Sequence, residues 1–288
     1  MRSRDATPAE GRVTGTLYVV STPIGNLEDL TLRALRILKE VDVIACEDTR
    51  HTRTLLAQYG IVRPLLSYHE QNERRRTAEL LQRLRKDASV ALVTDAGTPA
   101  LSDPGYAIVH AAAAEGIPVI AVPGASAVTA ALAVAGLPTD RFAFLGFLPR
   151  KSAERRRALE AVATIPWTLV FFEAPHRLRD MLKDARDVLG DRQVAVGREL
   201  TKRFEEVIRG SVADVQDHFR ATEPRGELTV VVAGAGENVE TTGTAEAELK
   251  EMLDAGMPPK NAVQIVARRH RVSRREVYHM MLKITGKR

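Results

Sequence analysis

The sequence is poor in cysteine and in aromatic residues, and both shortages limit what the chain can be. It has 288 residues and one cysteine, Cys46. A disulfide framework and a metal cage built on cysteine are therefore excluded, and the composition fits a reducing compartment such as the cytoplasm. Aromatic residues make up 5% of the chain, which does not favour a large apolar trough for a macrocyclic substrate.

Common cofactor and catalytic fingerprints are also missing from the sequence. It contains no G-x-G-x-x-G after a strand, no G-x-x-x-x-G-K-[ST] and no G-x-S-x-G. A dinucleotide enzyme, a P-loop enzyme and a serine hydrolase are therefore not indicated. The seven histidines are scattered, so we expect no metal site.

No stretch of the chain predicts a membrane span. Residues 117–139 carry no charge, but Pro118, Pro123 and Gly124 interrupt them, and small residues dominate. A strand, a turn and an alanine-rich helix explain this stretch better than a membrane helix does. Residues 1–14 have no apolar core, so we expect a disordered tail and no signal peptide.

The organisation of the chain predicts an α/β protein with two α/β domains. Predicted strands and helices alternate, which is typical of a parallel sheet. The pattern of apolar and small residues changes near residue 137, and this change divides an N-terminal domain (15–137) from a C-terminal one (138–234). A polar linker (235–244) and three short helical patterns (245–288) follow.

The basic charge is concentrated in these last residues. The chain has a net charge of +5, and residues 245–288 account for all of it, since they hold ten Lys or Arg and five Asp or Glu. We therefore expect a helix-turn-helix-like module that binds a polyanion. Its basic candidates are Arg268, Arg269, Arg271, Arg274 and Arg275.

Residues 90–105 (VALVTDAGTPALSDPG) predict a ligand-binding loop. A buried strand is followed by about ten loop residues that include glycines, prolines and aspartates, where two to six residues are usual. Ligands of parallel sheets bind outside the carboxyl ends of the strands, and small residues let backbone amides approach them. The residue types suit a medium-sized ligand that is held mainly by backbone groups.

Eight short motifs, taken in order, resemble those of one enzyme family. They are 21–27 (STPIGNL), 47–52 (EDTRHT), 95–99 (DAGTP), 102–105 (SDPG), 122–127 (VPGASA), 146–151 (GFLPRK), 173–178 (EAPHRL) and 198–202 (RELTK). The set resembles the tetrapyrrole-methylase (class III) fold of S-adenosylmethionine-dependent methyltransferases. Within it, the last three motifs are similar to those of the family that methylates the 2′-oxygen of a cytidine in 16S rRNA.

The resemblance implies a cofactor, a partner and a set of contact residues. The cofactor would be S-adenosylmethionine, bound in the cleft between the two α/β domains. The protein would act as a homodimer on a decoding-centre cytidine of 16S rRNA in the small ribosomal subunit. The implied cofactor contacts are Pro23, Gly25, Gly97, Thr98, Pro99, Leu101, Gly124, Ala125, Ser126, Phe172, Glu227, Leu228 and Thr229.

The chemistry of the reaction adds candidates for catalysis and for RNA binding. A ribose hydroxyl is a poor nucleophile at neutral pH, so it needs a base or a cation beside it. The catalytic candidates are Glu173, His176 and Lys202, and the RNA candidates in the α/β domains are Asp48, Arg50, Arg177 and Arg198. Purely structural roles stay open: Asp48 can pair with Arg50, Glu199 can pair with Lys202, and His176 can cap a helix.

Two other functions remain open at this point. A methylase of the same fold could act on a corrin or another small molecule, but that reading leaves residues 245–288 without a purpose. A nucleic-acid-binding regulator could use the α/β domains only to sense a ligand. The charged loop ends at 173–177 and 198–202 are more than a pure sensor needs.

Overall fold

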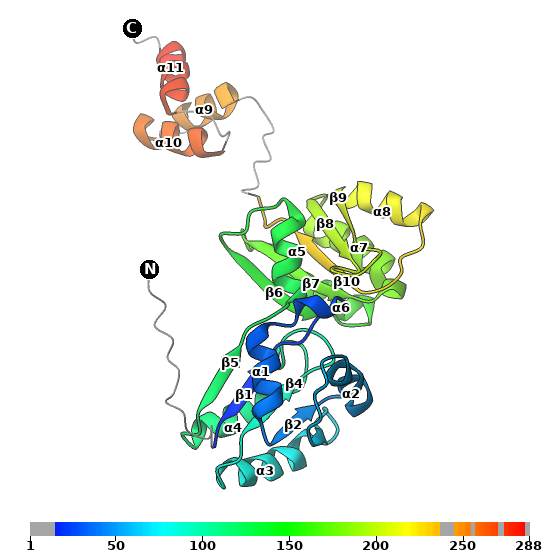
Figure 1. The fold of residues 1–288 in the computed structure, drawn as a ribbon. Helices are drawn as coiled ribbons and strands as arrows, with labels where there is room; N and C mark the ends of the chain where they lie inside the picture. Colours follow the sequence, from blue (N-terminus) through cyan, green and yellow to red (C-terminus); the bar gives the residue numbers. More distant parts are fainter. Residues whose placement is uncertain (1–14, 237–244, 255–256, 270–273, 286–288) are drawn as a thin grey trace.

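The computed structural model describes residues 15–236, 245–254, 257–269 and 274–285, and it confirms the predicted α/β organisation. Two five-stranded sheets follow each other along the chain, and three helices come after them (Figure 1). The predicted tail at residues 1–14 and most of the predicted linker, 237–244, lie outside the described residues.

The first sheet is parallel throughout, as the sequence predicts. Its strands are β1 (Leu17–Val20), β2 (Val43–Cys46), β3 (Leu65–Ser67), β4 (Val90–Val93) and β5 (Val119–Val122). They lie in the order β3-β2-β4-β1-β5, with parallel pairing at each step. Strands β2 and β4 are buried along their whole length, which explains their unbroken apolar sequences.

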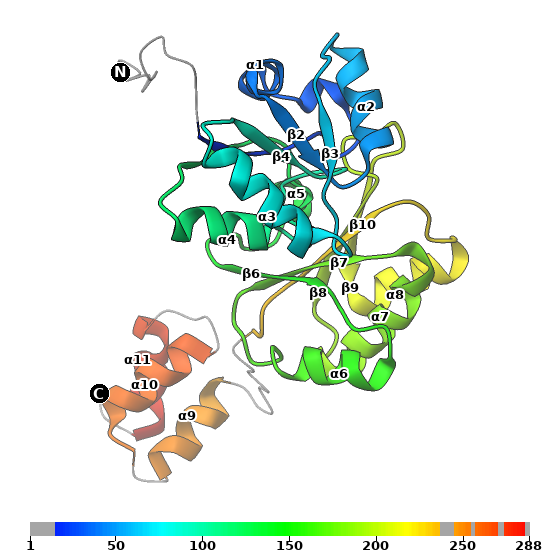
Figure 2. The same ribbon diagram turned by 90° about the horizontal axis from the view of Figure 1, so that it is seen from below.

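Helices cover both faces of this sheet. One face packs on α1 (Leu32–Glu40), which follows the short 3-10 turn η1 (Leu27–Asp29), and on α2 (Thr49–Gln58). The other face packs on α3 (Glu73–Leu84) and α4 (Tyr106–Ala114), which lie side by side in Figure 2. Thr31 caps α1, and the helix buries Ala34, Ile37 and Leu38 while Leu32 stays 85% exposed.

The second sheet is mixed, whereas the alternation of strands and helices predicts parallel strands. Its strands are β6 (Phe142–Phe147), β7 (Thr168–Glu173), β8 (Gln193–Arg198), β9 (Glu206–Ser211) and β10 (Leu228–Val232). In the order β6-β7-β10-β8-β9, only β6 and β7 are parallel. The difference arises because β8 and β9 follow each other directly as antiparallel neighbours and β10 inserts antiparallel between β7 and β8.

The two faces of the second sheet are covered by different parts of the chain. One face packs on α6 (Ser152–Glu160), α7 (Pro175–Leu189) and α8 (Val212–Ala221). The other face packs on α5 (Ala127–Ala135), the helix that directly follows the last strand of the first sheet. Val128, Leu132 and Ala135 of α5 share a core with residues of β7, β8 and β10. Helix α5 therefore ties the two sheets together.

The C-terminal helices have a core of their own. Helices α9 (Ala245–Asp254), α10 (Pro259–Arg269) and α11 (Arg274–Thr285) pack on one another. Their shared core includes Leu249, Val266 and Val277. The three predicted helical patterns are thus confirmed.

A buried ion pair joins α6 to α7, and its removal should destabilise the fold. Arg155 Nε lies 2.7 Å from Asp184 Oδ2, and the two side chains are 4% and 5% exposed. Asp184→Ala leaves the Arg155 guanidinium buried without its partner, so we expect a loss of about 3–5 kcal/mol in the free energy of unfolding. Urea denaturation followed by circular dichroism measures this loss.

The exposed pair between Arg36 and Glu40 of α1 provides the control. Glu40→Ala removes a carboxylate in the same way, but it should cost less than about 1 kcal/mol because water already solvates both groups. Equal losses in the two variants would show that burial of the Arg155–Asp184 pair does not matter.

Candidate active site

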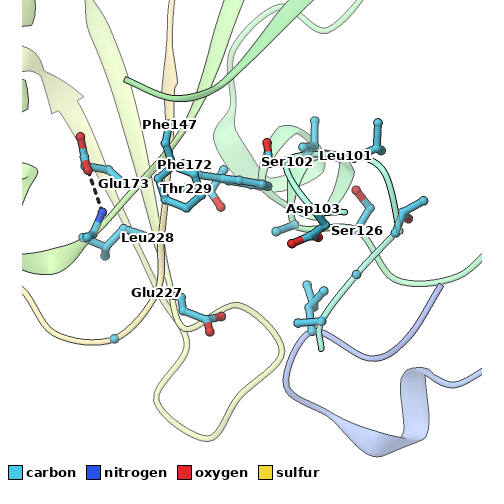
Figure 3. A pocket seen from close by; sticks show the side chains of 18 of the residues that line it. Leu101, Ser102, Asp103, Ser126, Phe147, Phe172, Glu173, Glu227, Leu228 and Thr229 are labelled. Carbon is cyan, nitrogen blue, oxygen red and sulfur yellow. Dashed lines mark hydrogen bonds between the residues drawn. The ribbon is translucent and has the colours of Figure 1, made fainter. Parts of the chain in front are cut away.

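A cavity of about 350 Å³ lies where the two sheets meet. It is lined by the loops after β4 and β5 and by the ends of β6, β7 and β10, and Figure 3 shows Phe147 and Phe172 on one side of it and Leu101, Ser102 and Asp103 on the other. Its size falls in the range of small-molecule sites. The lining residues are Ile24, Ala96, Gly97, Thr98, Leu101, Ser102, Asp103, Ser126, Ala127, Val128, Phe147, Phe172, Glu173, Ala174, Pro175, Gly226, Glu227, Leu228 and Thr229.

The loop after β4 is held rigidly against the loop after β1. Thr22 and Gly97 exchange backbone hydrogen bonds of 2.8 and 3.2 Å, and the hydroxyl groups of Ser21 and Thr98 are 2.8 Å apart. In the same loop, Ala100 and Ser102 have φ angles of 69° and 66°, in the left-handed region that residues other than glycine rarely adopt. Such strain costs about 1–3 kcal/mol per residue and persists where the surroundings enforce it, often at functional sites.

Glu173, at the end of β7, presents an unpartnered carboxylate oxygen inside the protein. Its side chain is 0% exposed, and Oε1 accepts a hydrogen bond of 2.8 Å from the backbone N–H of Ala174. Arg177 Nε is 3.1 Å from the same oxygen, too poorly aligned for a hydrogen bond. Oε2 has no hydrogen-bond partner in the described part of the chain. Burial raises the pKa of Glu173, against the opposing effects of Ala174 and Arg177.

Asp103 approaches the same cavity from the first sheet. Burial, and then the charge of Glu47, raise the pKa of its carboxyl group from 3.8 to about 6, while a hydrogen bond with Thr94 opposes the shift and Asp95 adds to it. Figure 3 shows Asp103 across the cavity from Phe172 and Glu227. Carboxyl groups whose pKa values are shifted this way are characteristic of functional sites.

The charge of the cavity lining is of one sign. Asp103, Glu173 and Glu227 are acidic, and among the described residues that line the cavity none is Lys, Arg or His. An excess of carboxylates at a cavity attracts a cationic ligand and repels a polyphosphate or a polycarboxylate. Apolar side chains complete the wall: the ring of Phe172 contacts those of Phe144 and Phe147, at centroid distances of 4.8 and 5.6 Å.

The cavity brings together most of the predicted cofactor residues. Gly97, Thr98, Leu101, Ser126, Phe172, Glu227, Leu228 and Thr229 line it. Pro23, Gly25, Pro99, Gly124 and Ala125 are not among the lining residues and lie in the loops just behind them. Gly124 is needed there for close packing, since a Cβ at this position would lie 3.0 Å from Cβ of Ser21.

The three catalytic candidates are found in different places. Glu173 lines the cavity. His176 is exposed in the first turn of α7 and is not among the lining residues, and its side chain makes no capping hydrogen bond. Lys202 is also outside the lining; its Nζ lies 3.0 Å from Glu199 and 3.1 Å from Glu227, so the structural alternative of a Glu199–Lys202 ion pair is confirmed.

Most RNA candidates of the α/β domains are engaged with their neighbours. Arg50 pairs with Asp48 at 2.7 Å, as the structural alternative predicts, and this contact lowers the pKa of Asp48. Arg177 donates a hydrogen bond to the carbonyl of Leu148, and Arg198 pairs with Glu206 at 3.0 Å. In the C-terminal module, Arg268 and Arg269 belong to α10, Arg274 and Arg275 belong to α11, and Arg271 lies outside the described residues.

Several lining residues are absent from the sequence-based contact set. Ser102 and Asp103 belong to the predicted ligand loop, and Phe147 belongs to the 146–151 motif, so these motifs pointed to the region but not to the side chains. Gly226 precedes β10 and lines the cavity because its strand inserts next to β7. No sequence pattern reveals that insertion.

Comparison with known proteins identifies the family. The sequence profile of the tetrapyrrole (corrin/porphyrin) methylases matches residues 16–216. The chain belongs to this methylase family. Two similar methylases are named ribosomal RNA small subunit methyltransferase I. The protein from Halalkalibacterium halodurans is 45% identical over 92% of this chain and 94% of its own length. The protein from Pseudomonas aeruginosa is 46% identical, over 95% and 99%.

A solved structure confirms the fold of the methylase. It is the uroporphyrin-III C-methyltransferase from Thermus thermophilus in complex with S-adenosyl homocysteine. The two chains are 24% identical, with a TM-score of 0.52, over 76% of this chain and 97% of the other. In the described residues, no helix is long and apolar enough to cross a membrane, and no group of three His, Cys, Asp or Glu side chains could hold a metal ion.

The raised pKa of Asp103 predicts a pH-dependent effect on stability. The folded methylase keeps the proton of Asp103 up to a pH of about 6, whereas the unfolded chain loses it near 3.8. Ionisation therefore opposes folding, and this opposition grows from about pH 4 to about pH 6. Asp103→Asn should leave the free energy of unfolding unchanged below pH 4 and raise it by about 1 kcal/mol at pH 7, after allowance for solvent screening.

Urea denaturation at pH 4 and pH 7 measures this difference. Asp140→Asn, in the exposed loop before β6, controls for the loss of one surface charge. A gain of the same size at both pH values would contradict the prediction.

Proposed function

We propose that this methylase transfers a methyl group from S-adenosylmethionine to the ribose 2′-oxygen of a decoding-centre cytidine in 16S rRNA. The observation that carries the proposal is the acidic cavity, whose carboxylates suit a cofactor with a cationic sulfonium and an ammonium group. The names of the similar methylases support small-subunit rRNA as the substrate. A protein with this substrate works where ribosomes are assembled, in the cytoplasm.

The lining residues fit the different parts of the cofactor. The aromatic ring of Phe172 and the side chain of Ile24 offer apolar surface for an adenine ring. The small residues Gly97 and Ala127 let the backbone come close to the ligand. Pro23, Gly25, Pro99, Gly124 and Ala125 would act from behind, by fixing the two loops that carry the lining residues.

We assign the proton transfer to Glu173. When bound, the cofactor supplies a methyl group on a sulfonium, whose sulfur keeps the electron pair of the broken carbon–sulfur bond. As the ribose oxygen forms its new bond to carbon, its proton must leave. Oε2 of Glu173 lacks a partner among the described residues, and a turn of this buried side chain from the α7 face toward the cavity would let it accept that proton. Its raised pKa makes it a better base than an exposed carboxylate.

The C-terminal helices would hold the RNA. The α/β domains carry no excess of basic residues, so they attract a polyanion only weakly. Helices α10 and α11 contain Arg268, Arg269, Arg274 and Arg275, and the module has its own core. It can therefore bind RNA as a separate unit while the cavity binds the cofactor.

A second copy of the chain would cover the edge of the second sheet. Strand β6 is an edge strand, and its Phe142, Leu145 and Phe147 are 43%, 37% and 55% exposed. An exposed apolar edge is normally covered or interrupted by charges, because it otherwise promotes aggregation. We propose that β6 lies in the interface of a homodimer.

Methyl incorporation tests the function directly. Small ribosomal subunits that lack the modification are incubated with the protein and methyl-labelled S-adenosylmethionine, and the RNA is digested to nucleosides. We expect labelled 2′-O-methylcytidine as the product. A truncated chain that ends at residue 236 should bind the cofactor normally and methylate poorly. Labelling of a corrin but not of RNA would instead favour the small-molecule alternative.

Glu173→Gln should abolish catalysis without preventing cofactor binding. Glutamine keeps the shape of the side chain but cannot accept the proton, so we expect kcat to fall by about 100-fold or more. The dissociation constant of S-adenosylhomocysteine, measured by calorimetry, should change less than about threefold. In the wild type, kcat should fall as pH drops through the raised pKa of Glu173, since the ionised form is the base.

Glu160→Gln is the control, because Glu160 is exposed at the end of α6, away from the cavity lining. Activity of Glu173→Gln close to that of this control would show that Glu173 does not take the proton.

Leu145→Glu should dissociate the homodimer. A charge in the centre of an apolar interface is left without a partner, so we expect sedimentation at the mass of a monomer, against a dimer for the wild type. Val62→Glu introduces the same charge at a residue that is 93% exposed in the loop after α2, and it should remain a dimer. A monomeric wild type, or a dimeric Leu145→Glu, would refute the proposed interface.

A further inference from the structure

Lys202 contacts residues of both α/β domains beside the cavity. It belongs to the loop between β8 and β9, and its Nζ lies 3.1 Å from Oε2 of Glu227, a cavity-lining residue. Its aliphatic stem lies against Gly25 of the loop after β1. A Cβ at Gly25 would be 2.3 Å from Cγ of Lys202 and 2.8 Å from its Cε.

Glu199 fixes Lys202 from the other side. Its Oε1 lies 3.0 Å from Nζ of Lys202 and accepts a hydrogen bond of 2.9 Å from the backbone N–H of Glu227. The backbone N–H of Glu199 in turn donates to the carbonyl of Glu227 at 2.9 Å. Glu199 therefore connects the Lys202 loop to the start of β10 through both its backbone and its side chain.

The two glycines beside this ion pair leave room for it. A Cβ at Gly226 would lie 2.4 Å from the carboxyl group of Glu199, just as one at Gly25 would collide with Lys202. The loop itself is strained, since Glu199 and Thr201 have φ angles of 50° and 68°. The loop is strained and packs against one glycine from each α/β domain. Such strain persists where the surroundings enforce it, which indicates that the position of this loop matters for function.

Lys202 stays protonated in this position. Burial lowers the pKa of Lys202, but the hydrogen bonds with Glu199 and Glu227 outweigh it and raise the pKa overall. The charged ammonium group can therefore hold the Glu227 carboxylate, whose side chain is 74% exposed and would otherwise sample many rotamers.

We propose that Lys202 is a positioning residue for the cofactor, which orients Glu227 toward the cavity and fixes the loop of Gly25 at the same time. Oriented in this way, the Glu227 carboxylate can accept hydrogen bonds from hydroxyl or ammonium groups of the cofactor. The proposal rests on the proposed function only in taking S-adenosylmethionine as the ligand. It gives the 198–202 motif a role in cofactor binding, outside the proton transfer.

Two substitutions of Lys202 separate its two contacts. Lys202→Met keeps an aliphatic stem against Gly25 but cannot bond to Glu227, so we expect the dissociation constant of S-adenosylhomocysteine to rise about tenfold. Lys202→Ala loses both contacts, and its affinity should be lower still. Calorimetry gives the affinities, and thermal denaturation shows that each variant is folded.

A double-mutant cycle tests the contact with Gly25. Gly25→Ala should weaken binding in the wild type, because the new Cβ displaces the Lys202 stem. In the Lys202→Ala background the colliding atoms are gone, so the same change should cost less, and what remains is the backbone strain that the φ of 155° at Gly25 imposes on alanine in both backgrounds. Gly60→Ala is the control, since Gly60 has a φ of 63° but nothing within 4 Å of a Cβ, and its affinity should stay that of the wild type.

The outcomes distinguish this proposal from the proposed function. If the wild type binds S-adenosylhomocysteine and Lys202→Met binds it equally well, Lys202 does not position the cofactor, and the proposed function is untouched. Full additivity of Gly25→Ala and Lys202→Ala would likewise overturn the contact. If the wild type does not bind S-adenosylhomocysteine at all, the assignment of the cofactor fails, and this proposal fails with it.

Discussion

The packing of helix α5 is the constraint on which the rest of the structure depends. Its sequence, AVTAALAVA, is almost entirely apolar, and the helix buries Val128, Ala131, Leu132 and Ala135 along one face. It directly follows β5 of the first sheet, yet it covers a face of the second sheet, together with Ile24 from the loop after β1. The carboxyl ends of the first sheet are thereby held beside the ends of β7 and β10, and the cavity lies between them.

Several residues around the cavity lower the stability of the folded protein. Ala100, Ser102, Glu199 and Thr201 hold left-handed backbone conformations around the cavity, and Glu173 keeps a buried oxygen without a partner among the described residues. Each of these features opposes folding. They are tolerated because the cores on both faces of each sheet are extensive, and together they give a rigid acidic surface before any ligand binds.

The same fold can serve different substrates, because the fold positions the cavity and the side chains decide what enters it. In this methylase the carboxylates of Asp103 and Glu227 face the cavity from the two sheets, and Glu173 lies at its wall. The excess of basic over acidic residues belongs instead to residues 245–288. This separation would allow the proposed cationic cofactor and the proposed RNA substrate to bind one chain without competing for the same charges.

The sequence by itself determined the local elements and the loops that carry the site. The apolar run of β4, the long loop after it and the alanine-rich α5 are all readable from local pattern, because burial and turn chemistry act on neighbouring residues. Eight of the thirteen implied cofactor residues consequently line the cavity. The parallel first sheet follows from the same alternation of strands and helices.

Only the tertiary structure decided which side chains meet. The insertion of β10 between β7 and β8 brings Gly226 and Glu227 to the cavity, and the crossing of α5 sets Lys202 against Gly25. The tertiary structure also places Glu173 in the cavity lining and leaves His176, three residues later, outside it. Such contacts join residues far apart in sequence, and they depend on strand order and helix packing, which the period of a local pattern does not encode.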